Sequence, residues 1–324
     1  MKRWNVIALV AILLPSVVIA FILFGRADRS MSILVERGQY RISFEEAQYN
    51  ETVRDPVFVE YAIKLGLRVT GRSLTPGLYT IPAGATQYTI ITMFVFGKRE
   101  PLVKITIPEG FTMFQIASRL KHRAQIDSAK FIEWCQSPNI RSKYGVASPS
   151  MDGFLLPATY HIIRTESWHD VASIMADESL RMWESLQGAS NVSRDSIVTL
   201  ASIVQREAVN NDELATIAGV YTNRLERSMR LEADPTVQYQ RDLRITLSDL
   251  RDASNAYNTY QHSGLPPGPI CNPGKGAITA ALRPEKHDYL FFVARGDNSG
   301  AHRFARSYSE HLANVRLYRM RTRN

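Results

Sequence analysis

The hydrophobic pattern along the chain predicts one long apolar span followed by many short helices and strands. Residues 4–24 form an uncharged and mainly apolar run. Farther on, apolar residues recur every three or four positions in some segments and every second position in others. These spacings are typical of amphipathic helices and of half-buried strands. The mixture predicts an α+β fold.

Two periodicities divide the rest of the chain into elements. We expect helices over residues 57–67, 88–96, 112–120, 127–135, 170–186, 197–207 and 217–225. Strand-like alternation marks residues 77–84, 103–107 and 289–294. Four prolines mark the last third as loop-rich: Pro266, Pro267, Pro269 and Pro273.

The run over residues 4–24 is long enough to cross a membrane. Its 21 residues would span roughly 30 Å of hydrocarbon as a helix. The run is longer than the core of a usual signal peptide, and no small-x-small cleavage site follows it. We therefore expect an uncleaved signal anchor. A cleaved export signal is the alternative, and it places the remaining chain in the same outer compartment.

The elements after the anchor group into two parts. We expect a cytoplasmic tip and transmembrane anchor in residues 1–29, a small α+β unit with its juxtamembrane segment in residues 30–100, and a larger α+β domain in residues 101–324. The small unit has two interpretations, a glycan-binding module or a spacer.

Composition narrows the classes of partner. The formal charge of +8 suits an anionic membrane surface or an acidic polymer. No nucleic-acid motif is present, and the basic residues are scattered among acids. Two cysteines are not a disulfide framework; one bridge and two free thiols are both compatible with the sequence. His302 and His311 are too far apart for a helical metal pair, and there is no nucleotide fingerprint, so we expect neither metal nor cofactor.

One carboxylate stands on a predicted apolar helix face. Ile197, Leu200, Val204 and Glu207 recur at spacings of three, four and three, so they share one side of a helix. Removing a carboxylate from water raises its pKa and makes it a usable general acid near neutral pH. Periodicity alone favours the plainer alternative, in which Glu207 ends a core stripe and pairs with an arginine such as Arg224.

Several segments resemble the YceG-like endolytic transglycosylases of bacterial cell-wall metabolism. In chain order they are IPEGFT (107–112), DGFLLPATY (152–160), LASIVQRE (200–207) with NRL (223–225), MRLEADPTVQY (229–239), YNTY (257–260), GLPPGPI (264–270) and NPG (272–274). Farther on, YLFFVA (289–294), GAHRF (300–304) and EH (310–311) also fit. Each segment alone is a weak signal, but all of them in this order are highly specific.

The resemblance implies a LysM-like subdomain at about residues 50–100 and a YceG-like catalytic domain from about residue 101. It implies cleavage within glycan strands of nascent peptidoglycan, with Glu207 as the catalytic acid. The chain departs from the family pattern in three places: Gln205 replaces the first acid of a Glu-x-Glu pair, Asp152 replaces a glutamate, and Cys271 lies in the Asn-Pro-Gly loop. Gln205 leaves Glu207 as the only ionisable candidate in its motif.

The remaining site residues are expected to bind substrate. They are Asp152, Asp234, Thr236, Tyr239, Tyr257, Asn258 and His302. Asp234 and Thr236 flank a proline in a predicted sharp turn and could face sugar hydroxyls, with helix capping as the alternative. Tyr257 and Asn258 suit stacking and hydrogen bonding to sugars, or else a buried strand with a satisfied amide. His302 suits a structural hydrogen bond better than a substrate contact.

The function expected is a membrane-anchored lytic transglycosylase that cuts MurNAc–GlcNAc bonds and leaves 1,6-anhydro-MurNAc ends. One carboxyl group, Glu207, would act first as acid and then as base. A muramidase-type hydrolase using Glu207 and Asp234 is one alternative. An inactive glycan-binding scaffold is the other, because of Gln205. Expected partners are peptidoglycan strands, the membrane, and peptidoglycan synthases and division proteins, with the catalytic domain on the outer side of the inner membrane.

Overall fold

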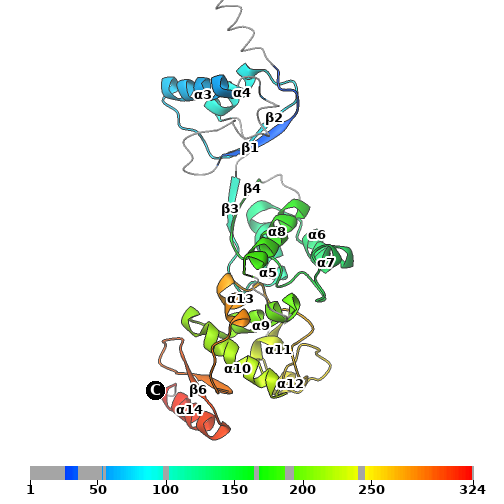
Figure 1. The fold of residues 1–324 in the computed structure, drawn as a ribbon, viewed down its shortest axis with the longest axis vertical. Coiled ribbons are helices and arrows are strands. Elements are labelled where there is room, and N and C mark those ends of the chain that lie inside the picture. The colour runs from blue at the N-terminus through cyan, green and yellow to red at the C-terminus, as the bar shows by residue number, and fades with distance from the viewer. Residues whose placement is uncertain are drawn as a thin grey trace, which may run out of the picture. The chain divides into compact units, whose positions relative to one another are not determined.

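The computed structural model describes residues 26–35, 53, 56–97, 102–163, 168–186, 193–239 and 245–322 (Figure 1). The chain divides into two compact units, Met1–Val103 with His161–Thr165 and Lys104–Tyr160 with Glu166–Asn324. The predicted domain boundary at residues 100 and 101 lies near this division. No helix in the described ranges is long and apolar enough to span a membrane. The predicted anchor at residues 4–24 lies outside those ranges.

In the described residues before 98, the first unit has strands and helices in alternating order. They are β1 (Met31–Val35), α3 (Pro56–Thr70), β2 (Gly77–Ile81) and α4 (Gln87–Phe96). The two strands pair antiparallel, with Met31 opposite Ile81. Tyr79 stacks on Phe94 with ring centroids 4.2 Å apart, inside a core to which both strands and both helices contribute. The LysM-like assignment of this unit stays a prediction.

The division between the units runs through the paired strands β3 and β4, and the elements after β3 other than β4 belong to the larger unit. In chain order the described elements from residue 102 onward are β3 (Leu102–Thr106), α5 (Met113–Ala124), α6 (Ser128–Gln136), α7 (Pro138–Lys143), β4 (Thr159–Ile163), α8 (Trp168–Leu186), α9 (Arg194–Glu207), η1 (Asn211–Glu213), α10 (Leu214–Glu226), α11 (Asp234–Gln238), α12 (Leu247–Leu250), α13 (Lys275–Leu282), β5 (Phe291–Ala294), β6 (His302–Ala305) and α14 (Tyr308–Arg321). Strand β3 pairs with β4, and β5 pairs antiparallel with β6. The α+β prediction is confirmed.

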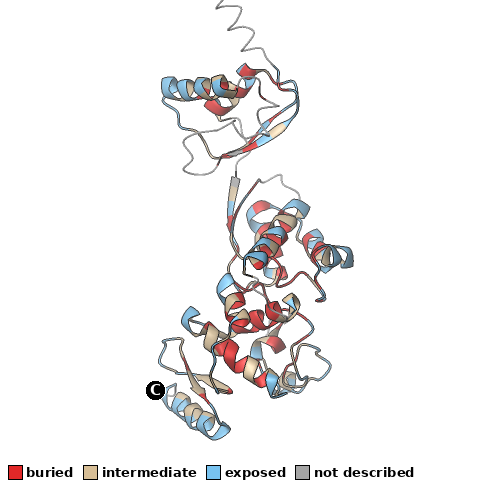
Figure 2. Ribbon diagram, viewed as in Figure 1, coloured by how far each residue is buried: buried red, intermediate tan, exposed pale blue. Residues whose placement is uncertain are grey.

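Helix α9 contributes to a large core cluster of the second unit. Its apolar face packs against α10 and α13, and α9 and α10 are mostly buried in Figure 2. The close approach of α13 follows from small side chains, since Ala277, Ala280 and Ala281 are all buried. The chain around Glu207 is therefore held by packing from two other helices.

Candidate active site

Glu207 is the last residue of α9, and its position follows from the stripe predicted along that helix. Ser193 caps the helix by accepting a hydrogen bond from the Ser196 amide. Ile197, Leu200 and Val204 are buried, and Glu207 continues their row. The helix stops at Ala208, whose backbone is extended. The carboxyl group thus emerges from the core where the helix ends, and a helix C-terminus disfavours negative charge.

The surroundings of Glu207 raise the pKa of its carboxyl group above the usual value for glutamate. Burial raises the pKa to about 7, and the nearby charge of Asp234 raises it as well. The Tyr221 hydroxyl donates a hydrogen bond to Glu207 Oε1 at 3.0 Å, which lowers the pKa. Arg224 and Arg206 also lower it. A carboxyl with a pKa near 7 can give and take a proton at neutral pH.

Glu207 opens into a cleft of about 260 Å³ within the second unit. Its lining combines two further carboxylates, an arginine and several aromatic rings: Tyr221, Arg224, Leu231, Glu232, Asp234, Tyr260, Phe291, Phe292, Tyr308 and His311. Asp234 shares this cleft with Glu207 and accepts a hydrogen bond from the Tyr260 hydroxyl at 2.7 Å. Aromatic faces beside carboxyl groups are suited to holding a sugar.

Arg224 supports the wall of the cleft and does not pair with Glu207. Its guanidinium donates to the carbonyls of Leu290 at 2.6 Å and Leu231 at 2.8 Å, and it forms an ion pair with Glu232 at 3.5 Å. It also lies over the Phe291 ring. Glu207 forms no ion pair within the described ranges. The simple core pairing of Glu207 with Arg224 is therefore not observed.

Asp152 lies inside the fold and not in the cleft. Its carboxylate is fully buried and accepts hydrogen bonds from the Met113 amide, the Tyr239 hydroxyl and the Asn272 side chain, at 2.8 to 3.0 Å. Burial raises its pKa to about 7. The Asn272 side chain also accepts from the amides of Gly153 and Leu155. This burial argues against the predicted substrate contact and makes Asp152 an anchor for several loops.

The segment around Asp234 is the start of a helix, so the sharp turn predicted there is wrong. Pro235 stands in the first turn of α11, where its missing N–H costs no hydrogen bond. Asp234 does not cap the helix. The Thr236 hydroxyl is buried, donates to the Ala233 carbonyl and lies 2.9 Å from the Thr259 hydroxyl. Asp234 thus reaches the cleft, whereas Thr236 is held in the interior.

Three more predicted site residues are separated from the cleft. Asn258 is fully buried and its amide holds the carbonyls of Asp249, Leu250 and Asp252. Tyr239 is buried, and its ring packs against the partly exposed Tyr257 with centroids 4.6 Å apart. These side chains organise the loop behind the site. None of the three lines the cleft around Glu207, and their substrate contacts stay a prediction.

His302 is tied to Glu213 in the interior of the second unit. Its Nδ1 lies 2.7 Å from a Glu213 carboxylate oxygen, and its backbone amide donates to the same carboxylate. His302 therefore forms the structural hydrogen bond that the sequence analysis favoured over a substrate contact. Within the described part of the chain, no cluster of His, Cys, Asp and Glu could hold a metal ion.

Gln205 and Cys271, which depart from the family pattern, both form hydrogen bonds at or near the Asn-Pro-Gly loop. Gln205 Oε1 accepts a hydrogen bond from the Gly274 amide at 2.9 Å. Cys271 is a free, buried thiol that donates to the Ser202 carbonyl, and burial raises its pKa. Cys135 is likewise free and buried. Position 205 therefore needs an acceptor oxygen, which glutamine supplies as well as glutamate.

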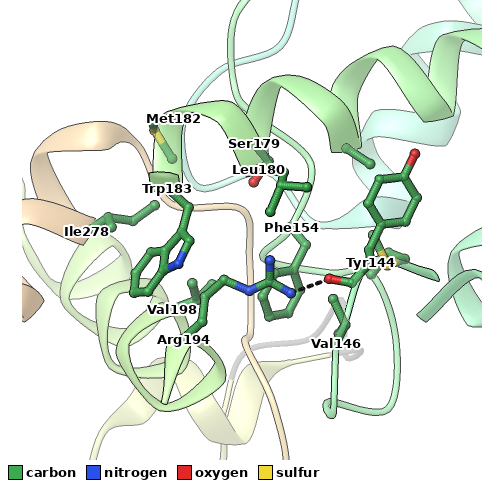
Figure 3. A pocket seen from close by; sticks show the side chains of 12 residues that line it. Tyr144, Val146, Phe154, Ser179, Leu180, Met182, Trp183, Arg194, Val198 and Ile278 are labelled. Carbon is green, nitrogen blue, oxygen red and sulfur yellow. Dashed lines mark hydrogen bonds between the residues drawn. The ribbon is translucent and has the colours of Figure 1, made fainter. Parts of the chain in front are cut away.

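A second cavity lies between α8 and α9, and it is too small for a substrate. It encloses about 10 Å³, roughly the space of one water molecule. Figure 3 shows the Arg194 guanidinium beside the Phe154 ring, with a hydrogen bond to the Tyr144 carbonyl. Arg194 also donates to the Gly145 carbonyl at 2.9 Å. These contacts join the start of α9 to the loop after α7.

Sequence reasoning missed most of the aromatic lining of the cleft. Tyr221 stands four residues after Ile217 and three before Arg224, on the buried face of α10. That spacing could have placed Tyr221 and Arg224 on the side of α10 that packs near Glu207. The rings of Phe292 and Tyr308 arrive from β5 and α14, which are distant in sequence. Local sequence patterns do not predict that Phe292 and Tyr308 line the same cleft.

Fold and site together define an α+β protein with a carboxyl group placed for acid–base chemistry. The YceG-like family matches residues 35–317. The chain is 30% identical over 280 residues to a Bacillus subtilis protein named endolytic murein transglycosylase, covering 79% of this chain and 77% of that protein. The chain therefore belongs to the YceG-like family, which confirms the predicted resemblance.

The chain is also similar to a second named protein and to a solved structure. A Streptococcus pneumoniae (strain R6) protein of the same name is 29% identical over 248 residues, which cover 67% of this chain and 45% of that protein. A crystal structure of a YceG-like protein from Listeria monocytogenes has a TM-score of 0.59 and 27% identity, covering 89% of this chain and 99% of that one.

Proposed function

We propose that this protein is a lytic transglycosylase that cleaves MurNAc–GlcNAc bonds within peptidoglycan strands. The observation that carries the proposal is the carboxyl group of Glu207, with a pKa of about 7, in an aromatic-lined cleft. Membership of the YceG-like family and the names of its relatives support the substrate class.

The proposed reaction uses one carboxyl group twice. Protonated Glu207 gives its proton to the glycosidic oxygen as the bond to C1 breaks. The carboxylate then accepts the proton of the 6-hydroxyl group of the same MurNAc, whose oxygen bonds to C1 and closes the 1,6-anhydro ring. Glu207 ends protonated, so the cycle needs no water. Tyr221 donates to the carboxylate form and steadies it between the two transfers.

Hydrolysis by Glu207 and Asp234 is a second candidate, and one observation favours it. Both carboxylates line the same cleft, and a hydrolase uses one carboxyl as acid and the other as base or nucleophile. The Tyr260 hydrogen bond holds the Asp234 carboxylate in place. The ends of the products separate the two reactions.

The proposal is tested by cleavage of uncrosslinked glycan strands with residues 26–324. Glu207→Gln should lower the rate by about 10³-fold, since it removes the proton donor. The matched control is Glu226→Gln, an exposed glutamate on α10, which should keep the wild-type rate. Cleavage at the wild-type rate by Glu207→Gln would contradict the role. Strand binding without cleavage by the wild type would instead favour the scaffold.

We further propose that residues 4–24 anchor the protein in the inner membrane with both units on the outer side, where nascent strands are made. The uncharged apolar run supports this placement. Peptidoglycan synthases and division proteins are the partners proposed there. Protease added to spheroplasts should degrade the residues after 26 in the full chain, whereas protection of these residues until lysis would refute the orientation.

A further inference from the structure

The outward face of α3 in the first unit is apolar where a surface helix is normally polar. Val59 and Ile63 of this helix are buried in the core of the first unit. On its outward side the exposed fractions are 64% for Val57, 66% for Tyr61, 49% for Leu65 and 77% for Val69. These four residues are spaced four apart, so they follow one side of the helix. Figure 2 shows the outer side of α3 as largely exposed. Contiguous exposed apolar groups mark a protein or membrane contact.

The same face carries every positive charge of this segment. Between residues 56 and 97 the charged side chains are Glu60, Lys64, Arg68 and Arg72. The three bases are exposed and stand four residues apart. These bases line a cavity of about 430 Å³ whose remaining lining is mainly apolar: Val57, Glu60, Tyr61, Ile63, Leu67, Ser73 and Leu74. Bases beside exposed apolar groups match the anionic lipids of a membrane surface.

Packing fixes this face outward. Gly66 lies against Val95 of α4 so closely that a Cβ at position 66 would come within 2.7 Å of the valine side chain. The tight contact sets the rotation of α3, with the basic and apolar side chains away from the core. Arg72 lies over the exposed Phe96 ring, which adds an aromatic group at the end of the face.

We propose that the α3 face, comprising Val57, Tyr61, Lys64, Leu65, Arg68, Val69 and Arg72, docks on a membrane surface containing anionic phospholipid. The inference builds on the membrane anchor proposed above. That anchor ends at residue 24, and Ala27 is already bonded to Ala85 of the first unit, so roughly 10 Å of chain separates them. The unit therefore stays beside the bilayer, and docking would orient it. An acidic polymer in water would leave the apolar groups without a partner.

The test is co-sedimentation of residues 26–324 with vesicles of phosphatidylglycerol and phosphatidylcholine. These residues lack the proposed anchor but keep the whole core of the first unit, which spans residues 27–94. We expect binding to the mixed vesicles and little to phosphatidylcholine alone. Changing Lys64, Arg68 and Arg72 to Gln should weaken binding about 100-fold, at about fivefold for each charge. Tyr61→Ser with Val69→Ser should also weaken it, because the apolar contact is lost.

The matched control changes three exposed bases of the second unit, Lys121, Arg123 and Lys130, to Gln. This control should bind vesicles like the wild type, and thermal unfolding should show each variant folded. Absence of wild-type binding, equal binding to phosphatidylcholine, or equal loss in the control would overturn the inference. Loss in the charge variant but not in the apolar variant would also refute lipid docking. Glycan cleavage by the same samples reports the proposed activity separately.

Discussion

Neighbouring groups shift the pKa of Glu207 in opposite directions. Burial and the charge of Asp234 raise its pKa, whereas the hydrogen bond from Tyr221 lowers it. The acid step requires the protonated form, so the rate should fall as the pH rises through about 7. Changing either neighbour therefore shifts the pH dependence in a known direction.

Tyr221→Phe and Asp234→Asn should move the alkaline limb of the rate in opposite directions. Removing the Tyr221 hydroxyl takes a donor from the ionised carboxylate, so the pKa of Glu207 rises and the limb moves to higher pH. Removing the charge of Asp234 lowers that pKa and moves the limb to lower pH. The pH dependence of kcat/KM on glycan strands measures both. Shifts in the same direction would refute the assignment of the limb to Glu207.

The sequence predicted the position of Glu207 better than the positions of the polar residues around it. The apolar stripe of α9 was visible in the spacing of Ile197, Leu200 and Val204. Asp152 and Asn258 were both expected to bind substrate, with a buried and satisfied amide as the alternative for Asn258, and both are fully buried. Their hydrogen-bond partners come from other loops, and local patterns do not report such partners.

At the level of elements, the site depends on how the end of α9 is joined to two loops. Gln205 accepts from the Gly274 amide, the Gly110 amide donates to the Asn272 carbonyl, and the Asn272 amide donates to the Phe111 carbonyl. The motifs at residues 107–112 and 272–274 are thus structural supports of the α9 terminus. Their role is to hold backbone, which explains why an uncharged glutamine is compatible at position 205.

Gln205→Glu and Gln205→Leu should differ in stability. Glutamate keeps an oxygen for the buried Gly274 N–H, whereas leucine leaves that donor without an acceptor, so Gln205→Leu should lose about 1–3 kcal/mol of unfolding free energy. Denaturant unfolding of residues 26–324 measures the difference. Equal stability of the two variants would show that this hydrogen bond does not support the loop.

Helix prediction succeeded where apolar spacing was strong and failed where it was weak. The helix expected at residues 112–120 is α5 (Met113–Ala124), and the one expected at 170–186 is α8 (Trp168–Leu186). Helix α13 (Lys275–Leu282) was not predicted, because its alanines and glycine give little contrast between faces. Helix α14 was also missed, and none of its residues is buried.

On the scale of the whole molecule, the two units have separate cores. The core of the first unit is built from residues between Ala27 and Phe94, and a cluster of the second from buried residues between Trp183 and Ala281. Separate cores favour separate unfolding transitions. The sequence predicted a boundary between the units at residues 100 and 101. It did not predict the packing of α9 against α13, because these helices are far apart in the chain.

A protein starting at residue 30 should be less stable than one starting at residue 26, in the first unit only. The Ala27 amide donates to the Ala85 carbonyl, and the Gly84 amide donates to the Ala27 carbonyl, both at 2.8 Å. Losing these bonds and the buried Ala27 should cost about 1–3 kcal/mol. Calorimetry should show one transition shifted and the other unchanged, with glycan cleavage intact. A shift of both transitions would contradict the independence of the units.

We propose that a single carboxyl group, Glu207, cleaves the strand without water. The decisive measurement is mass spectrometry of the products from uncrosslinked strands, with Glu207→Gln beside the wild type. We expect internal fragments ending in 1,6-anhydro-MurNAc from the wild type and none from the variant. Reducing ends from the wild type would contradict it and assign the second carboxyl role to Asp234.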